Sequence, residues 1–135
     1  METAQKILEK ISAGDIYARH NGIEIVEIRP GYAKTRMVVG ENHLNAVNIT
    51  HGAAVFGLVD LAFAAASNSH GQVAVALNMN ISYVKATTVG NILTATATED
   101  KLTNRTGLYR IVVEDEKGDL VAVAEGLVFR KNDTI

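Results

Sequence analysis

Hydrophobic residues recur with different periods along the chain, and each change of period marks a predicted element. An amphipathic helix is expected over about residues 3–12, where apolar side chains follow helical spacing at Ile7, Leu8 and Ile11. Residues 22–29 and 32–39 are rich in Ile, Val, Thr and Met, and they flank Pro30-Gly31, a dipeptide that favours a tight turn. These two segments therefore predict a β-hairpin.

A long apolar segment in the middle of the chain predicts the main helix. Residues 42–50 have no periodicity and are interpreted as a loop, with Thr50 as the N-cap of a helix over residues 51–69. This helix is apolar nearly all round, so it must be covered by other elements. The only partner available is a sheet that curls around it.

Beyond Gly71 the period changes to two. Residues 73–83 alternate between an apolar face, Val73 to Tyr83 at odd positions, and a small or polar face that includes Ala76 and Asn78. The second face is expected to point away from the helix, toward another subunit or a ligand. Three more strands are expected, and the turn compositions between them favour an antiparallel meander; they span residues 91–102, 107–115 and 120–130. The pattern as a whole predicts an α+β fold.

Composition narrows the class of protein. The 135 residues fit one domain, 1–135, and the net charge of −2 argues against capture of nucleic acid or an anionic membrane. The chain has no cysteine, and its histidines lack metal-ligand spacing, so neither a disulfide nor a metal site is expected. The N-terminal segment resembles no secretory signal, and a cytoplasmic location is expected.

Asp60 is the main candidate for chemistry. It is the only formally charged residue between Asn42 and Val84, and it lies inside the predicted apolar helix. A carboxylate in apolar surroundings must be paired, hydrogen-bonded or used in a reaction. From composition alone, a structural role, such as capping a backbone or pairing with Lys or Arg across an interface, is as plausible as catalysis.

The spacing of a few residues around Asp60 resembles the hotdog-fold acyl-CoA thioesterases of the PaaI-like subgroup. The motif is Asn45-x5-His51-Gly52-Ala53-x2-Phe56-x3-Asp60-x7-Asn68, and residues 78–85, 90–95 and 119–126 resemble the family's later strands. The resemblance covers about residues 22–130. It implies an antiparallel sheet wrapped around a central helix, assembled as a homodimer and further as a homotetramer.

The resemblance also implies roles for four residues. Gly52, in the first helical turn, would offer its amide to the thioester oxygen, although close helix packing is an alternative. Asp60 would be a general base or a nucleophile. It lies roughly 12 Å along the helix from Gly52, which suggests that the two meet across a subunit interface. Asn45 would bind the carbonyl oxygen or fix the loop, and His51 would orient the loop or transfer a proton.

The chain departs from the family pattern at two alanines. Ala53 stands where a second glycine is common, and Ala76 stands where some relatives hold the water with a hydroxyl side chain. Ala53, Phe56, Ala76 and Asn78 are expected to contact substrate, as are two cations for the coenzyme A phosphates, Lys85 and Arg105.

The predicted function is hydrolysis of an aryl- or medium-chain acyl-CoA thioester. Coenzyme A enters as part of the substrate, and no cofactor is expected. The alternative is a hotdog protein that binds acyl-CoA without turnover, as a sensor or carrier. A hydratase or dehydratase is a third possibility, but no histidine with a second acid is evident.

Overall fold

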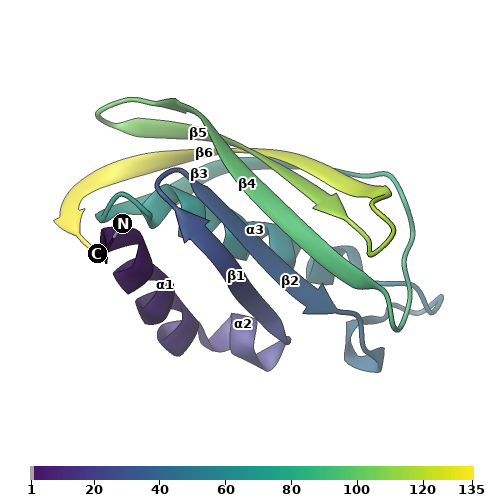
Figure 1. Cartoon of the computed structure of the whole chain (residues 1–135). Helices are drawn as coiled ribbons and strands as arrows, with labels where there is room; N and C mark the ends of the chain where they lie inside the picture. The colour runs from purple at the N-terminus through teal and green to yellow at the C-terminus, as the bar shows by residue number, and fades with distance from the viewer. Residues whose placement is uncertain (1) are drawn as a thin grey trace.

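A six-stranded antiparallel sheet curls around one long helix in the computed structural model, which describes residues 2–135 (Figure 1). The elements in chain order are α1 Glu2–Gly14, α2 Ile16–His20, β1 Ile23–Arg29, β2 Tyr32–Val38, the 3₁₀ turn η1 Glu41–His43, α3 Gly52–Asn68, β3 Gln72–Tyr83, β4 Ile92–Leu102, β5 Thr106–Glu114 and β6 Leu120–Thr134. The predicted hairpin is confirmed as β1 and β2, with Gly31 at φ 74° in the turn. Glycine adopts this left-handed conformation without a Cβ penalty.

The strand order is β1-β2-β4-β5-β6-β3. The predicted meander is confirmed as β4, β5 and β6, while β3 crosses to the far edge and pairs with β6. The crossing chain between β3 and β4, residues 84–91, passes the beginning of α3 in Figure 1. This route brings residues far apart in the sequence to one end of the central helix.

Most of α3 packs into the concave side of the sheet. Its inward side chains are almost fully buried: Leu58, Val59, Ala62, Phe63, Ala65 and Ala66. One stripe of α3 remains uncovered in the single chain, and it comprises Ala53, Phe56, Gly57, Asp60 and Ala64. The predicted sheet that curls around the helix is therefore confirmed, but in one protomer the sheet, α1 and α2 reach only part of the helix circumference.

The predicted alternation along β3 holds after Asn78, where Met79 and Ile81 pack against the core, and is wrong before it, because the extra residue Leu77 interrupts the pairing with β6. The register shifts between Gln72 and Ala74 and again between Ala76 and Asn78. A bulge inserts one unpaired residue, which moves the following side chains to the opposite face. Consequently, Ala76 shares a face with the buried Val128, whereas the exposed Leu77 and Val75 do not point into the core.

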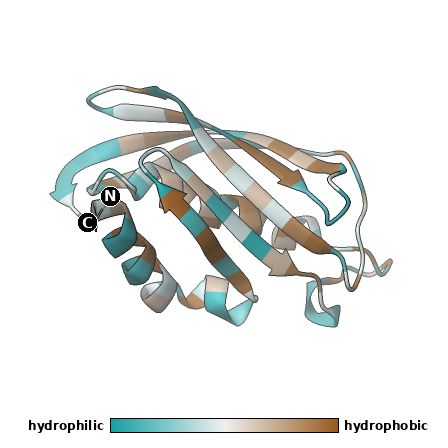
Figure 2. Cartoon of the chain, in the orientation of Figure 1, coloured by the Kyte–Doolittle hydropathy of each residue, from teal (hydrophilic) through white to brown (hydrophobic). Residues whose placement is uncertain are grey.

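The N-terminal helices cover the β1 side of the molecule. Ala4 and Ile7 of α1 are each 3% exposed, and Figure 2 shows hydrophilic residues on the outer side of this helix. Ala18 anchors α2 in the core. Across residues 2–135, none of the helices is both long and apolar enough to span a membrane.

Candidate active site at the beginning of the central helix

The first turn of α3 has one free backbone amide. His51, not the predicted Thr50, is the N-cap: its Nδ1 accepts a hydrogen bond from the Ala53 amide at 3.0 Å. The amides of Ala54 and Val55 donate to the His51 carbonyl oxygen. Within the described chain, no acceptor is found for the Gly52 amide. Since the positive end of the helix dipole lies here, this amide can stabilise a negatively charged oxygen.

Thr50 does not cap the helix because its hydroxyl has another partner. Its side chain is buried and accepts a hydrogen bond from the Thr87 hydroxyl at 2.7 Å, while the Thr50 amide donates to the Thr87 carbonyl at 2.8 Å. The loop before α3 is thereby fastened to the crossing chain. The Gly52 amide is fixed in position by this attachment.

Asn45 closes the loop that leads to the helix. Its Oδ1 accepts hydrogen bonds from the amides of Val47 at 3.0 Å and Ile49 at 3.2 Å. Among the described residues, both hydrogen bonds of this side chain use Oδ1, so the Nδ2 group can still donate. Asn45 therefore has the loop-fixing contacts that the sequence suggested and a donor to spare.

Asn45 and Gly52 line one cavity of about 410 Å³. Val55 of α3 also lines it, and the remaining wall comes from β3, the crossing chain and β6, with Tyr83, Lys85, Thr87 and Val121 among its residues. The cavity thus combines an apolar lining with donors at the helix start, the combination suited to a polarised carbonyl group.

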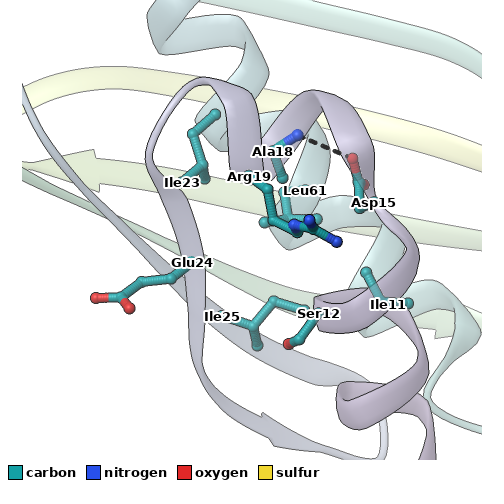
Figure 3. Close-up of a pocket in the computed structure, with 9 residues that line it drawn as sticks. All are labelled: Ile11, Ser12, Asp15, Ala18, Arg19, Ile23, Glu24, Ile25 and Leu61. Atoms are coloured by element: carbon teal, nitrogen blue, oxygen red, sulfur yellow. Dashed lines mark hydrogen bonds between the residues drawn. The ribbon is translucent and has the colours of Figure 1, made fainter.

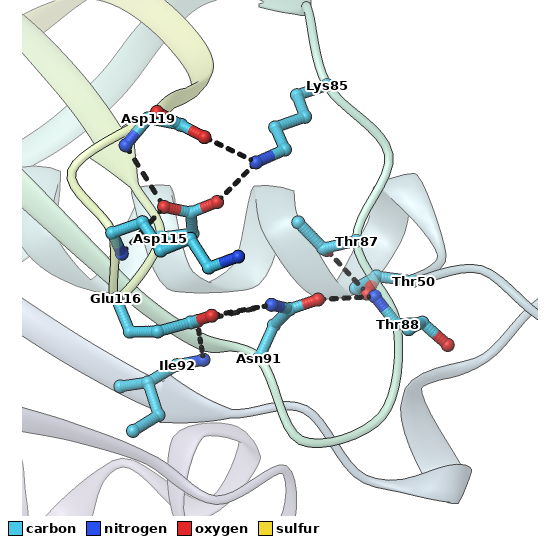
Figure 4. Close-up of polar contacts among 10 residues, drawn as sticks. Thr50, Lys85, Thr87, Thr88, Asn91, Ile92, Asp115, Glu116 and Asp119 are labelled. Carbon is cyan, nitrogen blue, oxygen red and sulfur yellow. Dashed lines mark hydrogen bonds and ion pairs between the residues drawn. The ribbon is translucent and has the colours of Figure 1, made fainter.

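Lys85 lines this cavity, but its charge is already paired. Its Nζ lies 2.6 Å from Asp115 Oδ2 and 2.8 Å from Asp119 Oδ2, both on the β5–β6 turn (Figure 4). The hydrogen bond to Lys85 holds the pKa of the Asp115 carboxyl below its ordinary value, and the hydrogen bond to Asp115, followed by that to Asp119, raises the pKa of Lys85. Lys85 therefore clamps two turns together rather than offering a free cation.

Arg105 does not flank this cavity within one chain. It lies in the turn between β4 and β5, where its carbonyl oxygen accepts a hydrogen bond from the Arg130 amide. The turn and the start of β3 lie beside the same end of β6, so Arg105 is near the point where α3 ends and β3 begins. Because the β4–β5 hairpin points the other way along the sheet, the expected phosphate-binding Arg105 lies far from the N-terminus of α3 within one chain.

Asp60 lies in a second hollow, of about 460 Å³, on the uncovered side of α3. The predicted Ala53 and Phe56 line it, and so do Tyr17, Gly57 and Tyr83. The Asp60 side chain keeps access to solvent, yet desolvation by surrounding groups, followed by the negative charge of Asp15, raises the pKa of its carboxyl. A raised pKa makes a carboxylate a better proton acceptor near neutral pH.

Tyr83 separates the two cavities, because its ring lines both. Gly52 and Asp60 of one chain therefore open into different cavities. Ala76 and Asn78 line neither of them; Ala76 lies on the helix-facing side of β3, and Asn78 lies on the outer side. Phe63 of α3 lines neither cavity and is buried edge-on against Tyr109.

Tyr17 is a lining residue that the sequence did not reveal. It belongs to α2, outside the motif, and its neighbour Ile16 is also exposed, so no pattern distinguished it. A further hollow of about 210 Å³ lies between the two N-terminal helices, α1 and α2, and strand β1 (Figure 3).

Residues 2–135 contain no group of three or more His, Cys, Asp or Glu that could hold a metal ion. That the protein needs no metal or cofactor stays a prediction.

Comparisons with known proteins place the chain in a family. The family described as Thioesterase superfamily matches residues 47–122, which include Gly52, Asp60 and the crossing chain. The chain is 48% identical over 109 residues to an Archaeoglobus fulgidus protein named "Putative esterase". The match covers 81% of this chain and 71% of that protein.

Two further similarities involve Escherichia coli. The chain is 36% identical over 121 residues to acyl-coenzyme A thioesterase PaaI of strain K12, covering 90% of this chain and 86% of the relative. The solved structure of the E. coli PaaI protein from the phenylacetic acid degradation operon superposes with a TM-score of 0.96 at 33% identity, covering 99% of this chain and 97% of that one. The resemblance noted in the sequence and the α+β hotdog fold are confirmed.

Proposed function

The chain belongs to the thioesterase superfamily and is a thioester hydrolase, and from this premise we propose that it hydrolyses acyl-CoA to a free acid and coenzyme A. The observation that carries the proposal is the Gly52 amide, for which residues 2–135 offer no acceptor, in a residue that lines the same cavity as Asn45. The name of the E. coli relative supports acyl-CoA as the substrate class. The acyl group is proposed to be aryl or medium-chain.

In the proposed mechanism, the thioester oxygen accepts hydrogen bonds from the Gly52 amide and the Asn45 side chain. As the tetrahedral intermediate forms, negative charge develops on this oxygen, and a fixed amide donor is typically worth a few kcal/mol there. Tyr83 supports the donor, since its hydroxyl donates to the Gly52 carbonyl oxygen at 3.1 Å. His51 acts through its cap of the helix rather than on the substrate.

Asp60 supplies the base. It removes a proton from water as the water oxygen attacks the acyl carbon; the C–S bond then breaks, and the coenzyme A sulfur takes up a proton. Direct attack by the Asp60 carboxylate would instead give an anhydride that water opens, with the same net products. Either route suits a carboxyl whose pKa is raised by desolvation and by Asp15.

We place the complete site between two subunits. Gly52 and Asp60 of one chain are roughly 12 Å apart along α3 and open into different cavities. A second subunit with its α3 antiparallel would bring its Asp60 to the first subunit's Gly52. The uncovered stripe of α3 and the long edge strand β3 support this homodimer.

Further assembly into a homotetramer is supported by three exposed apolar residues on the outer side of the sheet: Val75, Val123 and Phe129.

The test is release of free thiol from aryl, short-chain and long-chain acyl-CoAs by the native protein and by Asp60→Asn. The variant is expected to lose about a hundredfold or more in kcat at matched folding and oligomeric state. Asp133→Asn is the matched control, because the Asp133 side chain is an exposed carboxylate near the end of β6, and this variant is expected to keep native turnover.

Three outcomes separate the alternatives. Native turnover that survives in Asp60→Asn would retain the thioesterase function and reject the role of Asp60. A native protein that binds acyl-CoA but releases no thiol would instead be a sensor or carrier. A change in the absorbance of an enoyl-CoA without thiol release would indicate a hydratase.

A further inference from the structure

Tyr17 lies directly on the backbone of α3, one helical turn before Asp60. A Cβ placed on Gly57 would lie 3.0 Å from Tyr17 Cε1 and 3.4 Å from its hydroxyl oxygen. Such a contact is closer than most Cβ atoms make, so the absence of a side chain at position 57 lets the Tyr17 ring lie against α3. A large aromatic side chain is thus packed against the helix that carries the base.

The Tyr17 backbone is held in place although the residue is 56% exposed. Asp15 Oδ1 caps α2 by accepting a hydrogen bond from the Ala18 amide at 3.0 Å (Figure 3). At the other end, the Asn21 amide and its Nδ2 group both donate to the Tyr17 carbonyl oxygen, at 3.1 and 2.9 Å. Because Ala18 is buried, α2 is anchored to the core, and Tyr17 is presented in a defined position.

The hollow in front of Asp60 is rich in aromatic rings. Three of the seven Phe and Tyr residues in the chain line it: Tyr17, Phe56 and Tyr83. Besides Asp60, the other lining residues are Ala53, with only a methyl group, and Gly57, with no side chain, and they leave room for a planar group. Aromatic rings favour one another in offset or edge-to-face arrangements beyond the effect of buried area alone.

We propose that Tyr17 is a specificity-determining residue that forms one wall of the acyl pocket and favours aromatic over linear acyl groups. This inference rests on the proposed function, since it assumes that the acyl group of the thioester occupies the hollow beside Asp60. The residue that would select the acyl group, Tyr17, belongs to α2, which lies outside the Asn45–Asn68 motif. Residues of α2 can therefore change the acyl preference without altering the groups that perform the reaction.

The experiment compares phenylacetyl-CoA with hexanoyl-CoA as substrates of the native protein, Tyr17→Leu and Tyr17→Phe. Leucine keeps apolar bulk but removes the ring. The kcat/KM for phenylacetyl-CoA divided by that for hexanoyl-CoA should therefore fall roughly three- to tenfold in Tyr17→Leu. Phenylalanine keeps the ring and should preserve the ratio. Ile16→Ala is the matched control, because Ile16 is 78% exposed on the same helix and does not line the hollow.

The same pair of ligands is then measured by calorimetry in an Asp60→Asn background, where turnover is suppressed. A shift in the ratio of dissociation constants caused by Tyr17→Leu supports the pocket assignment even if the native protein releases no thiol. In that case the proposed function fails while the role of Tyr17 stands. An unchanged ratio in both binding and turnover, or an equal loss for both ligands, would overturn the inference.

Discussion

The Tyr83 hydroxyl donates a hydrogen bond to the Gly52 carbonyl oxygen at 3.1 Å, which joins the last residue of β3 to the first residue of α3. The two residues are 31 positions apart in the sequence. This contact fixes the peptide that begins the helix. It also places one aromatic ring between the Gly52 cavity and the Asp60 hollow.

Replacing Tyr83 with phenylalanine should reduce kcat more than it changes KM. The ring remains as the wall between the cavities, but the Gly52 carbonyl loses a partner, and a hydrogen bond of this kind contributes about 1 kcal/mol. We expect a fall in kcat of roughly three- to tenfold in steady-state assays. Tyr32→Phe is the control, because Tyr32 lies under Arg29 on the β1–β2 hairpin. An unaltered kcat in Tyr83→Phe would contradict a supporting role for this bond.

Substituting His51 distinguishes a capping role from proton transfer. Asparagine at a helix N-cap accepts the same backbone hydrogen bond as His51 Nδ1, so His51→Asn should keep kcat within about threefold of the native value. Alanine removes the cap, and His51→Ala should lose about 1 kcal/mol of unfolding free energy together with part of the activity. Thermal unfolding and thiol release measure the two effects. An equally severe loss of kcat in both variants would indicate that His51 transfers a proton.

Asp15→Asn should shift the pH dependence of hydrolysis toward acid. Desolvation, the larger cause of the raised Asp60 pKa, stays in the variant, whereas the negative charge of Asp15 is removed. The Asp60 pKa then falls, more of the carboxyl is ionised at a given acidic pH, and the rising limb of the kcat/KM profile moves to lower pH. Asparagine can still cap α2 through the Ala18 amide, which keeps Tyr17 in place. A limb that stays in place or moves to higher pH would contradict this assignment.

Lys85→Met should weaken the fold without impairing capture of coenzyme A. The ammonium group is already neutralised by Asp115 and Asp119, so KM for acyl-CoA is expected to stay within about threefold of the native value. Thermal unfolding should show a lower Tm near neutral pH. A large rise in KM with unchanged Tm would restore Lys85 as a phosphate-binding residue.

The pH range of this stabilisation follows from the two pKa shifts. The pKa of Asp115 is lowered from 3.8, and that of Lys85 is raised from 10.5. The ion pair therefore makes its full contribution to the free energy of unfolding between pH 3.8 and pH 10.5. The contribution disappears as pH falls through the lowered Asp115 pKa or rises through the raised Lys85 pKa. The difference in Tm between native protein and Lys85→Met should therefore shrink in acid.

The sequence by itself determined the elements with local causes. Pro30-Gly31 fixed the hairpin turn, the apolar segment before Asn68 fixed α3, and turn residues separated the strands of the meander. The motif also placed Gly52 at the helix start and Asp60 on the same helix, since helical spacing is set by neighbouring residues. Local backbone preferences and short-range periodicity are sufficient for such features.

Only the tertiary structure decided which distant groups meet. The bulge after Ala76 leaves no signature in the alternating pattern, yet it changes which side chains of β3 face the helix. The pairing of Lys85 with Asp115 and the packing of Tyr17 on Gly57 depend on strand order and on the route of α2. These contacts join residues about 30 to 40 positions apart, and packing of the whole chain, rather than local preference, determines them.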